Sequence, residues 1–221
     1  MVDLAALLLA DGRFPSGGHA HSGGVEAAVA DGRIAGLADL PGFLAGRLAT
    51  VGLVDACLAA ATRRRGPAPP LDELVAEADA RCASPALRGV SRALGRQLLR
   101  SAVVMWPESS ALADALSAAA PASIAFGVVG LVAGLDTAET ATVTAYHAVV
   151  GPATAAVRLL GFDPRAAFAI VFDLHGALDE VVATAVATAD APLDAIPGRS
   201  STVMELAAER HSRAEARLFA S

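Results

Sequence analysis

The 221-residue sequence contains no lysine, so all 17 of its basic side chains are arginines. A phosphate-binding P-loop needs a lysine after its glycines, and this absence excludes one. Aromatic residues make up only 4% of the chain, whereas hydrophobic residues make up 54%. Runs of β-branched and aromatic residues, which are typical of strands, are scarce. A chain rich in alanine is instead typical of closely packed helices, and we predict an all-α fold.

The chain has only two cysteines, Cys57 and Cys82, and neither lies in a CxxC pair or at a metal-ligand spacing from a histidine. This pattern is typical of reduced thiols in a cytosolic protein. The formal net charge of −6 disfavours nucleic acid as the main partner. No basic region precedes the short apolar run near the N-terminus, so we expect no signal peptide. We therefore expect a cytoplasmic protein that binds no nucleic acid.

The segment 115–135 raises the question of a membrane span, because it carries no charge and the mean hydropathy of the chain is +0.51. Pro121 interrupts it, and a helix that begins there would rise only about 22 Å by Leu135. The hydrocarbon core of a bilayer is roughly 30 Å thick. Alanine, glycine and serine dominate the segment, and they insert poorly. We interpret it as a buried helix of a soluble bundle and expect no membrane partner.

Prolines, glycines and capping residues divide the chain into segments that we predict to be helical. These segments are 4–9, 25–34, 41–63, 71–82, 85–105, a short one from 108, 121–135, 137–160, 164–188 and 202–221. Gly151 and Pro152 are expected to kink the helix over 137–160. No repeat of fixed period is visible. We predict one domain, residues 1–221, that is a bundle of roughly eight to ten helices with an exposed loop at 13–24.

The stretch RFPSGGHAHSGGVEAAV, residues 13–29, has the composition of several kinds of site. Ser22 lacks the GxSxG setting of a hydrolase nucleophile. His19 and His21 could hold a cation only if Glu26 or another side chain completed the ligand set. We favour a structural turn, in which glycines supply positive φ angles and Ser22 or Glu26 caps the next helix. We expect no cofactor and no tight metal site, and a small helical enzyme using His19, His21 and Glu26 is the alternative.

Four arginines recur at every fourth residue of the expected helix over 85–105 and therefore share one side of it. They are Arg88, Arg92, Arg96 and Arg100. This pattern indicates a solvated face, with an acidic protein partner as the alternative.

Three glycines, Gly127, Gly130 and Gly134, interrupt the most apolar of the expected helices. Each glycine inside a helix costs about 1 kcal/mol relative to alanine. We expect close helix–helix crossings in the core to compensate for this cost.

The C-terminal segment VMELAAERHSRAEARLFAS differs from the apolar body before it. A helix there would place Arg210, Arg213 and Arg217 on one face, with Leu218 and Phe219 at an apolar tip. Arginine and aromatic side chains are typical of protein interfaces, which indicates a docking helix over 202–221. The alternative is a helix that folds back on the body with Phe219 in the core.

Three segments together resemble the urease accessory protein F family, UreF. LLLADGRFPSGGHAHSGGVE resembles its N-terminal block LLxLxDSxxPxGGFxHSxGLE, RGVSRALGRQLL is similar to its central RxxSxxxGxxLL helix, and H…RLFAS is similar to its closing HExxxxRLFxS. Order and spacing agree over nearly the whole chain. The matching positions are Asp11, Phe14, Pro15, Gly17, Gly18, His21, Ser22, Gly24, Glu26, Arg88, Ser91, Gly95, Leu98, Leu99, His211, Arg217, Leu218, Phe219 and Ser221.

The sequence departs from the family pattern at four places. His19 stands where the family usually has an aromatic residue, and Ser212 replaces the usual glutamate. PASIAFG, residues 121–127, lacks a histidine often found there, and GFDPRAA, residues 161–167, differs from the usual LGQxxGQ.

The resemblance implies an all-α, non-catalytic protein that dimerises and binds a second accessory protein, UreD, also called UreH. It implies that this complex recruits the GTPase UreG, so that nickel reaches the active site of the urease apoprotein. Partner-binding residues are expected at His211, Arg217, Leu218, Phe219, Ser221, Phe14, Pro15, Gly18, Ser22, Glu26 and Arg88.

Overall fold

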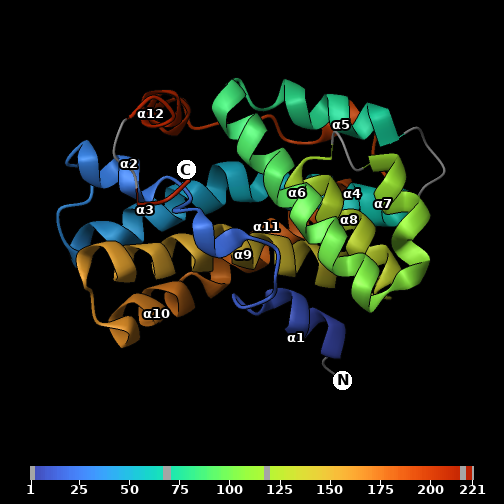
Figure 1. Cartoon of the computed structure of the whole chain (residues 1–221), viewed down its shortest axis with the longest axis horizontal. Coiled ribbons are helices and arrows are strands. Elements are labelled where there is room, and N and C mark those ends of the chain that lie inside the picture. Colours follow the sequence, from blue (N-terminus) through green and yellow to red (C-terminus); the bar gives the residue numbers. More distant parts are fainter. Residues whose placement is uncertain (1–2, 67–70, 117–119, 215–217, 221) are drawn as a thin grey trace.

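The computed structural model describes residues 3–66, 71–116, 120–214 and 218–220. Helices connected by turns account for these residues, and no strand occurs among them, which confirms the all-α prediction (Figure 1). Arg217 and Ser221, both expected in the docking segment, lie outside the described residues.

The fold is built around α4 (Leu53–Arg65), whose residues from Ala56 to Thr62 are all buried. It packs against α8 (Ala122–Val132), α9 (Thr137–Leu160) and α11 (His175–Thr188). A helix with neighbours on several sides must be apolar on several faces, and the alanines of α4 let those neighbours approach. The other helices are α1 (Leu4–Ala10), α2 (Val25–Ala30), α3 (Leu40–Arg47), α5 (Leu71–Ala80), α6 (Pro85–Met105), α7 (Ser110–Leu116), α10 (Pro164–Asp173) and α12 (Thr202–His211).

Among the described residues, the continuous helical segment over 37–65 is the one that is long and apolar enough to cross a membrane. It comprises the 3₁₀ turn Leu37–Asp39, α3, a π turn at Leu48–Gly52 and α4. Within its most apolar window 56% of the residues are buried inside the chain. Because α4 is packed in the core, we interpret the apolar composition of this segment as that of a core helix. The described residues of the segment 115–135, considered above, include the end of α7 and the shorter apolar helix α8.

Three predicted helix boundaries differ most from the structure, and two of these corrections have a local cause. The helix predicted over 25–34 ends at Ala30, because Gly32 has a φ of +70° and the N–H of Arg33 donates to Ala28 O at 2.8 Å, as in a Schellman cap. The helix predicted over 164–188 is divided at Leu174, where His175 Nδ1 lies 3.0 Å from Phe172 O.

The third wrong boundary is that of the C-terminal helix, which ends at His211 and does not extend to residue 221. By contrast, Pro152 lies inside α9, which continues through it to Leu160. Because some predicted helices are divided, the described residues contain more helices than the eight to ten expected.

Close helix crossings explain two of the three glycines in the apolar segment. A Cβ on Gly127 would lie 2.6 Å from the backbone oxygen of Ala59 in α4, and one on Gly130 would lie 2.4 Å from Thr140 Oγ1 in α9. The expectation of close packing is confirmed at these two positions. Gly134 differs, because it follows α8 with a φ of +81° and has open space around its Cβ position.

We predict that Gly127→Ala lowers the free energy of unfolding by about 1–3 kcal/mol, because α4 and α8 would have to separate to admit the methyl group. Gly89→Ala is the matched control, since Gly89 lies inside α6 with nothing within 4 Å of its Cβ position. This control should stabilise the protein by up to about 1 kcal/mol through helix propensity. Urea denaturation measures both values, and equal effects of the two substitutions would contradict the crossing.

Candidate functional site

The glycine-rich loop at 13–24 is ordered by contacts with α6 and with the core. Phe14 is only 7% exposed and belongs to the main hydrophobic core. The carbonyl oxygen of Pro15 accepts hydrogen bonds from Ser101 Oγ at 2.6 Å and Gln97 Nε2 at 3.3 Å. The start of the loop is therefore attached to α6 through side chains of that helix.

Three glycines of the loop have the left-handed conformation that favours glycine. Gly17, Gly23 and Gly24 have φ angles of +80°, +61° and +91°. A Cβ on Gly23 would also lie 2.7 Å from Cγ of Pro152 in α9. Gly18 has an ordinary φ and only Ser16 Oγ near its Cβ position, at 3.7 Å. The loop therefore requires glycine more strictly at positions 17, 23 and 24 than at position 18.

Ser22 and Glu26 have different roles at the start of α2. Ser22 is fully buried, and its Oγ accepts a hydrogen bond from the N–H of Glu26 at 3.3 Å. The carboxylate of Glu26 does not cap α2 but points to the C-terminal tail. Its Oε1 accepts from the N–H of Leu218 at 2.7 Å, and its Oε2 accepts from the N–H of Phe219 at 3.0 Å. Glu26 thus joins the two ends of the chain.

The tail, residues 218–220, folds back onto the loop and α9. The N–H of Ala220 donates to Ala20 O at 2.8 Å, and the ring of Phe219 is buried at 5% exposure. Arg158 of α9 lies over that ring, 4.9 Å from its centroid, and donates to His19 O at 2.8 Å. The chain thus adopts the folded-back arrangement of Phe219, although α12 ends at His211 and Phe219 lies in the tail beyond it.

Polar contacts attach α12 to α2 and α6 before the tail begins. Glu209 accepts hydrogen bonds from Ser84 Oγ at 2.5 Å and from the N–H of Ala86 at 2.8 Å, where α6 starts. Arg210 forms an ion pair with Asp31 at 2.6 Å. His211 Nε2 lies 3.4 Å from Glu26 Oε2, which is an ion-pair distance if the ring is protonated, but the contact lacks hydrogen-bond geometry.

Most of the motif on α6 has a structural role. Ser91 Oγ accepts a hydrogen bond from the N–H of Ala122 at 2.9 Å, which caps the start of α8. A Cβ on Gly95 would lie 2.2 Å from Ala120 O, so only glycine admits this approach. Arg88 donates to Cys82 O at 2.6 Å and Ala83 O at 3.0 Å. Arg92 likewise forms an ion pair with Asp79. The arginine face of α6, which we expected to be solvated, is therefore partly engaged in contacts within the fold.

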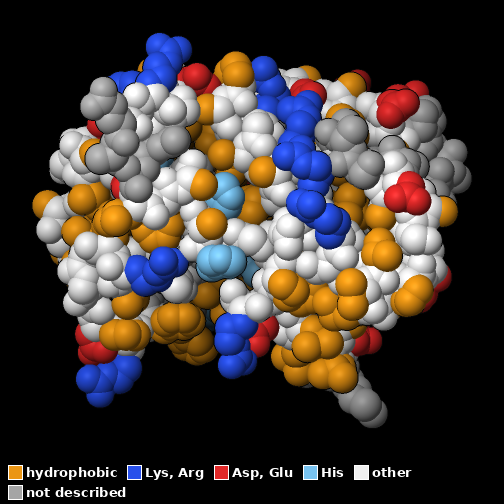
Figure 2. Space-filling model, viewed as in Figure 1, with side chains coloured by type: hydrophobic (Ala, Val, Ile, Leu, Met, Phe, Trp, Pro, Cys, Tyr) orange, Lys and Arg blue, Asp and Glu red, His pale blue; other side chains and the backbone are white. Residues whose placement is uncertain are grey.

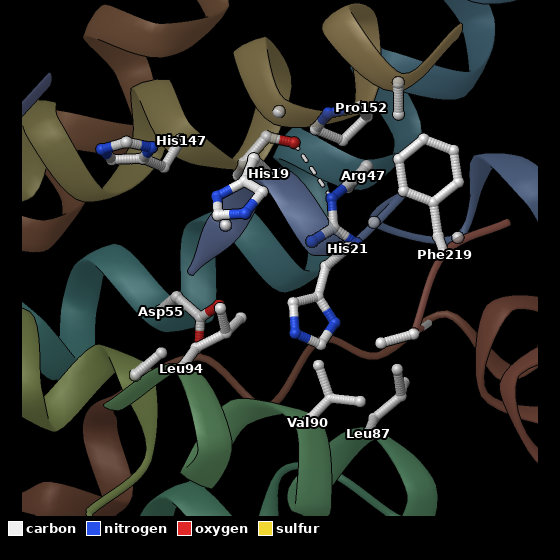
Figure 3. A pocket seen from close by; sticks show the side chains of 18 of the residues that line it. His19, His21, Arg47, Asp55, Leu87, Val90, Leu94, His147, Pro152 and Phe219 are labelled. Atoms are coloured by element: carbon white, nitrogen blue, oxygen red, sulfur yellow. Dashed lines mark hydrogen bonds between the residues drawn. The ribbon is translucent and has the colours of Figure 1, made fainter. Parts of the chain in front are cut away.

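A cavity of about 350 Å³ lies behind the loop and the tail. One wall is the apolar side of α6, formed by Leu87, Val90 and Leu94 (Figure 3). The face of the molecule seen in Figure 2 has a hollow that contains histidine side chains. A band of basic side chains over α6 lies beside this hollow. His19, His21, Arg47, Asp55 and His147 also line the cavity, and Phe219 lies at its edge.

Arg47 is held in the cavity by a carbonyl oxygen of α9 that lacks its helical hydrogen bond. Pro152 has no N–H, so the carbonyl oxygen of Ala148, four residues earlier, lacks its helical donor. Arg47 Nε donates to that oxygen at 3.0 Å (Figure 3). The sequence contains a signal for the free carbonyl, which is the proline, but none for the side chain that reaches it. Sequence reasoning therefore missed Arg47.

Burial shifts the protonation of several groups in the cavity. Burial raises the pKa of Asp55 to about 6 from its ordinary 3.8, although Arg47 and a hydrogen bond from Ser123 lower it. Burial lowers the pKa of His21, with a smaller effect from His19. Burial also lowers the pKa of His147, whose Nε2 lies 2.6 Å from Leu9 O. Burial likewise lowers the pKa of Arg47, although the charge of Asp55 raises it. Burial therefore disfavours the charged form of each of these side chains.

The geometry does not assemble the alternative catalytic group. The carboxylate of Glu26 is directed to the tail amides, whereas His19 and His21 line the cavity. Within the described ranges, no three histidine, cysteine, aspartate or glutamate side chains lie close enough to hold a metal ion.

Comparison with known proteins gives a consistent result. The UreF family model matches residues 34–175. The chain is 42% identical over 223 residues to the urease accessory protein UreF of Mycolicibacterium vanbaalenii, with 100% of both chains covered. It is 43% identical over 224 residues to the protein of that name from Mycobacterium sp. strain JLS and 37% identical over 222 residues to that of Mycobacterium tuberculosis, again with 100% of both chains covered. These similarities include the loop and the tail, which the family model does not span.

We predict that Asp55→Asn becomes more stabilising, relative to the unchanged chain, as the pH rises from 4 to 7. The unfolded chain releases the Asp55 proton near pH 3.8, whereas the folded chain retains it to about pH 6. The buried charge therefore lowers the free energy of unfolding across this window, by up to about 3 kcal/mol. Urea denaturation at several pH values measures the difference. Asp179→Asn, at an exposed aspartate of α11, is the control. A difference for Asp55→Asn that stays constant across these pH values would contradict the burial of its charge.

We predict that Glu26→Ala releases the tail. Each hydrogen bond to a charged group contributes about 1.5–3 kcal/mol, so amide hydrogen exchange in the C-terminal peptide should speed up at least about tenfold. Mass spectrometry of exchanged protein measures this rate. Glu108→Ala, at an exposed glutamate before α7, is the control. Unchanged exchange in the Glu26 variant would show that the carboxylate does not hold the tail.

Proposed function

Because the chain belongs to the UreF family of urease accessory proteins, we propose that it is a non-catalytic scaffold for urease maturation. In this role it works in the cytoplasm as a homodimer and binds a second accessory protein, UreD or UreH. The complex recruits the GTPase UreG and enables nickel insertion into the urease apoprotein. The proposal includes no cofactor, no nucleic acid and no membrane partner.

The observation that carries this proposal is the full-length similarity to proteins named urease accessory protein UreF, at about 40% identity. The geometry supports it, because the contacts of Glu26 and Pro15 bring the N-terminal, central and C-terminal motifs to one side of the molecule. Such a surface, assembled from segments distant in sequence, suits recognition of another folded protein.

We further propose that the partner surface consists of the outer side of α12 together with the tail. Val203 and Leu206 are 54% and 60% exposed, and Leu218 is 77% exposed. Arg210 and Arg213 are also exposed on this side. Apolar and arginine side chains of this kind dominate the energetics of protein interfaces. In this arrangement the buried Phe219 anchors the tail, and Leu218 is presented to the partner.

The test is affinity capture of the second accessory protein by the full chain. We expect Leu218→Ser to weaken capture at least about tenfold while the melting temperature stays unchanged, because the side chain is exposed in the free protein. Val104→Ser is the matched control, since Val104 is 82% exposed near the end of α6. Phe219→Ala should lower both capture and the melting temperature.

Unchanged capture by the Leu218 variant would reject the proposed surface, whereas failure of the unchanged chain to capture the partner would reject the scaffold function. Sedimentation of the purified chain tests the homodimer separately.

A further inference from the structure

The cavity behind the loop contains a cation without a directly paired carboxylate. Arg47 is partly buried, and its Nε is taken by Ala148 O. Among the described residues, no carboxylate lies within ion-pair distance of its guanidinium. A guanidinium has five N–H donors, so one bond leaves most of them for another acceptor.

One candidate for that acceptor inside the chain is Asp55, whose charge attracts Arg47 from beyond ion-pair distance. Burial disfavours its charge and raises the pKa of its carboxyl group. Asp55 therefore compensates the guanidinium incompletely. The other arginine at the cavity, Arg158, is already engaged with His19 O and the ring of Phe219.

The rest of the cavity is suited to an apolar group. Leu87, Val90 and Leu94 project into it from α6, opposite Arg47 (Figure 3). Its volume of about 350 Å³ is at the small end of the range of ligand pockets, about 300–1,000 Å³. Pockets of this kind are mostly apolar, with a few polar groups that orient the ligand.

We propose that this cavity is a binding site for a small organic anion with an apolar chain. The anionic head accepts hydrogen bonds from the guanidinium of Arg47, and the apolar chain packs on Leu87, Val90 and Leu94. Charge-assisted hydrogen bonds between a guanidinium and a carboxylate are among the strongest in proteins, and they give the head its specificity. The site lies behind the surface proposed for partner binding and does not depend on the scaffold function.

Calorimetric titration of the full chain with octanoate tests the proposal, with octan-1-ol as the neutral ligand of equal chain length. We expect saturable binding of one octanoate and binding of octanol at least about tenfold weaker, because the alcohol lacks the charge. Arg47→Gln should weaken octanoate to the level of octanol. Asp55→Asn should tighten octanoate at least about threefold, because it removes a competing negative charge.

Two further variants keep the test independent of the structural role of Arg47. Val90→Trp should abolish binding of both ligands by filling the cavity, and it leaves the bond to Ala148 O intact. Arg96→Gln is the control on α6, since Arg96 does not line this cavity. The proposal is overturned if octanoate does not bind, if octanol binds equally well, or if Val90→Trp leaves octanoate binding unchanged.

Discussion

The carbonyl oxygen of Ala148 is the point on which the arrangement of the site depends. Pro152 cannot donate to this oxygen, and a buried carbonyl without a donor is costly. Arg47 supplies the donor from the end of α3, just before the π turn. Gly52 in that turn admits the close approach, since a Cβ there would lie 3.1 Å from Cβ of Ala148. A proline in α9 therefore leaves a carbonyl oxygen that holds the guanidinium of Arg47 at the end of α3.

The same helix, α9, supports both ends of the chain. Pro152 leaves room only for a glycine at position 23 of the loop, and Arg158 holds His19 O and covers Phe219. Glu26 then connects the loop helix to the tail across a sequence separation of 192 residues. Because α9 contacts both the loop and the tail, it sets how these two segments lie beside each other.

The interior charges show a compromise between stability and chemistry. Asp55 destabilises the folded chain at neutral pH, since burial raises its pKa to about 6. A sequence selected for stability alone would replace it with a neutral side chain. Its position in the same cavity as Arg47 is the kind of local conflict that proteins show at functional sites.

The sequence by itself determined the helical class and most helix starts, because those depend on neighbouring residues. Ser84 caps α6, and Asp136 forms a capping box at the start of α9. Gly127 and Gly130 were predictable as packing positions, but their partners were not. Only the tertiary structure decided that α12 stops at His211 and that the tail turns back. The reason is physical: the acceptor for the tail amides is Glu26, and the cover for Phe219 is Arg158, and neither is near the tail in sequence. The cavity with Arg47 and Asp55 likewise exists only once α3, α4 and α9 have packed, so no local pattern could have indicated it.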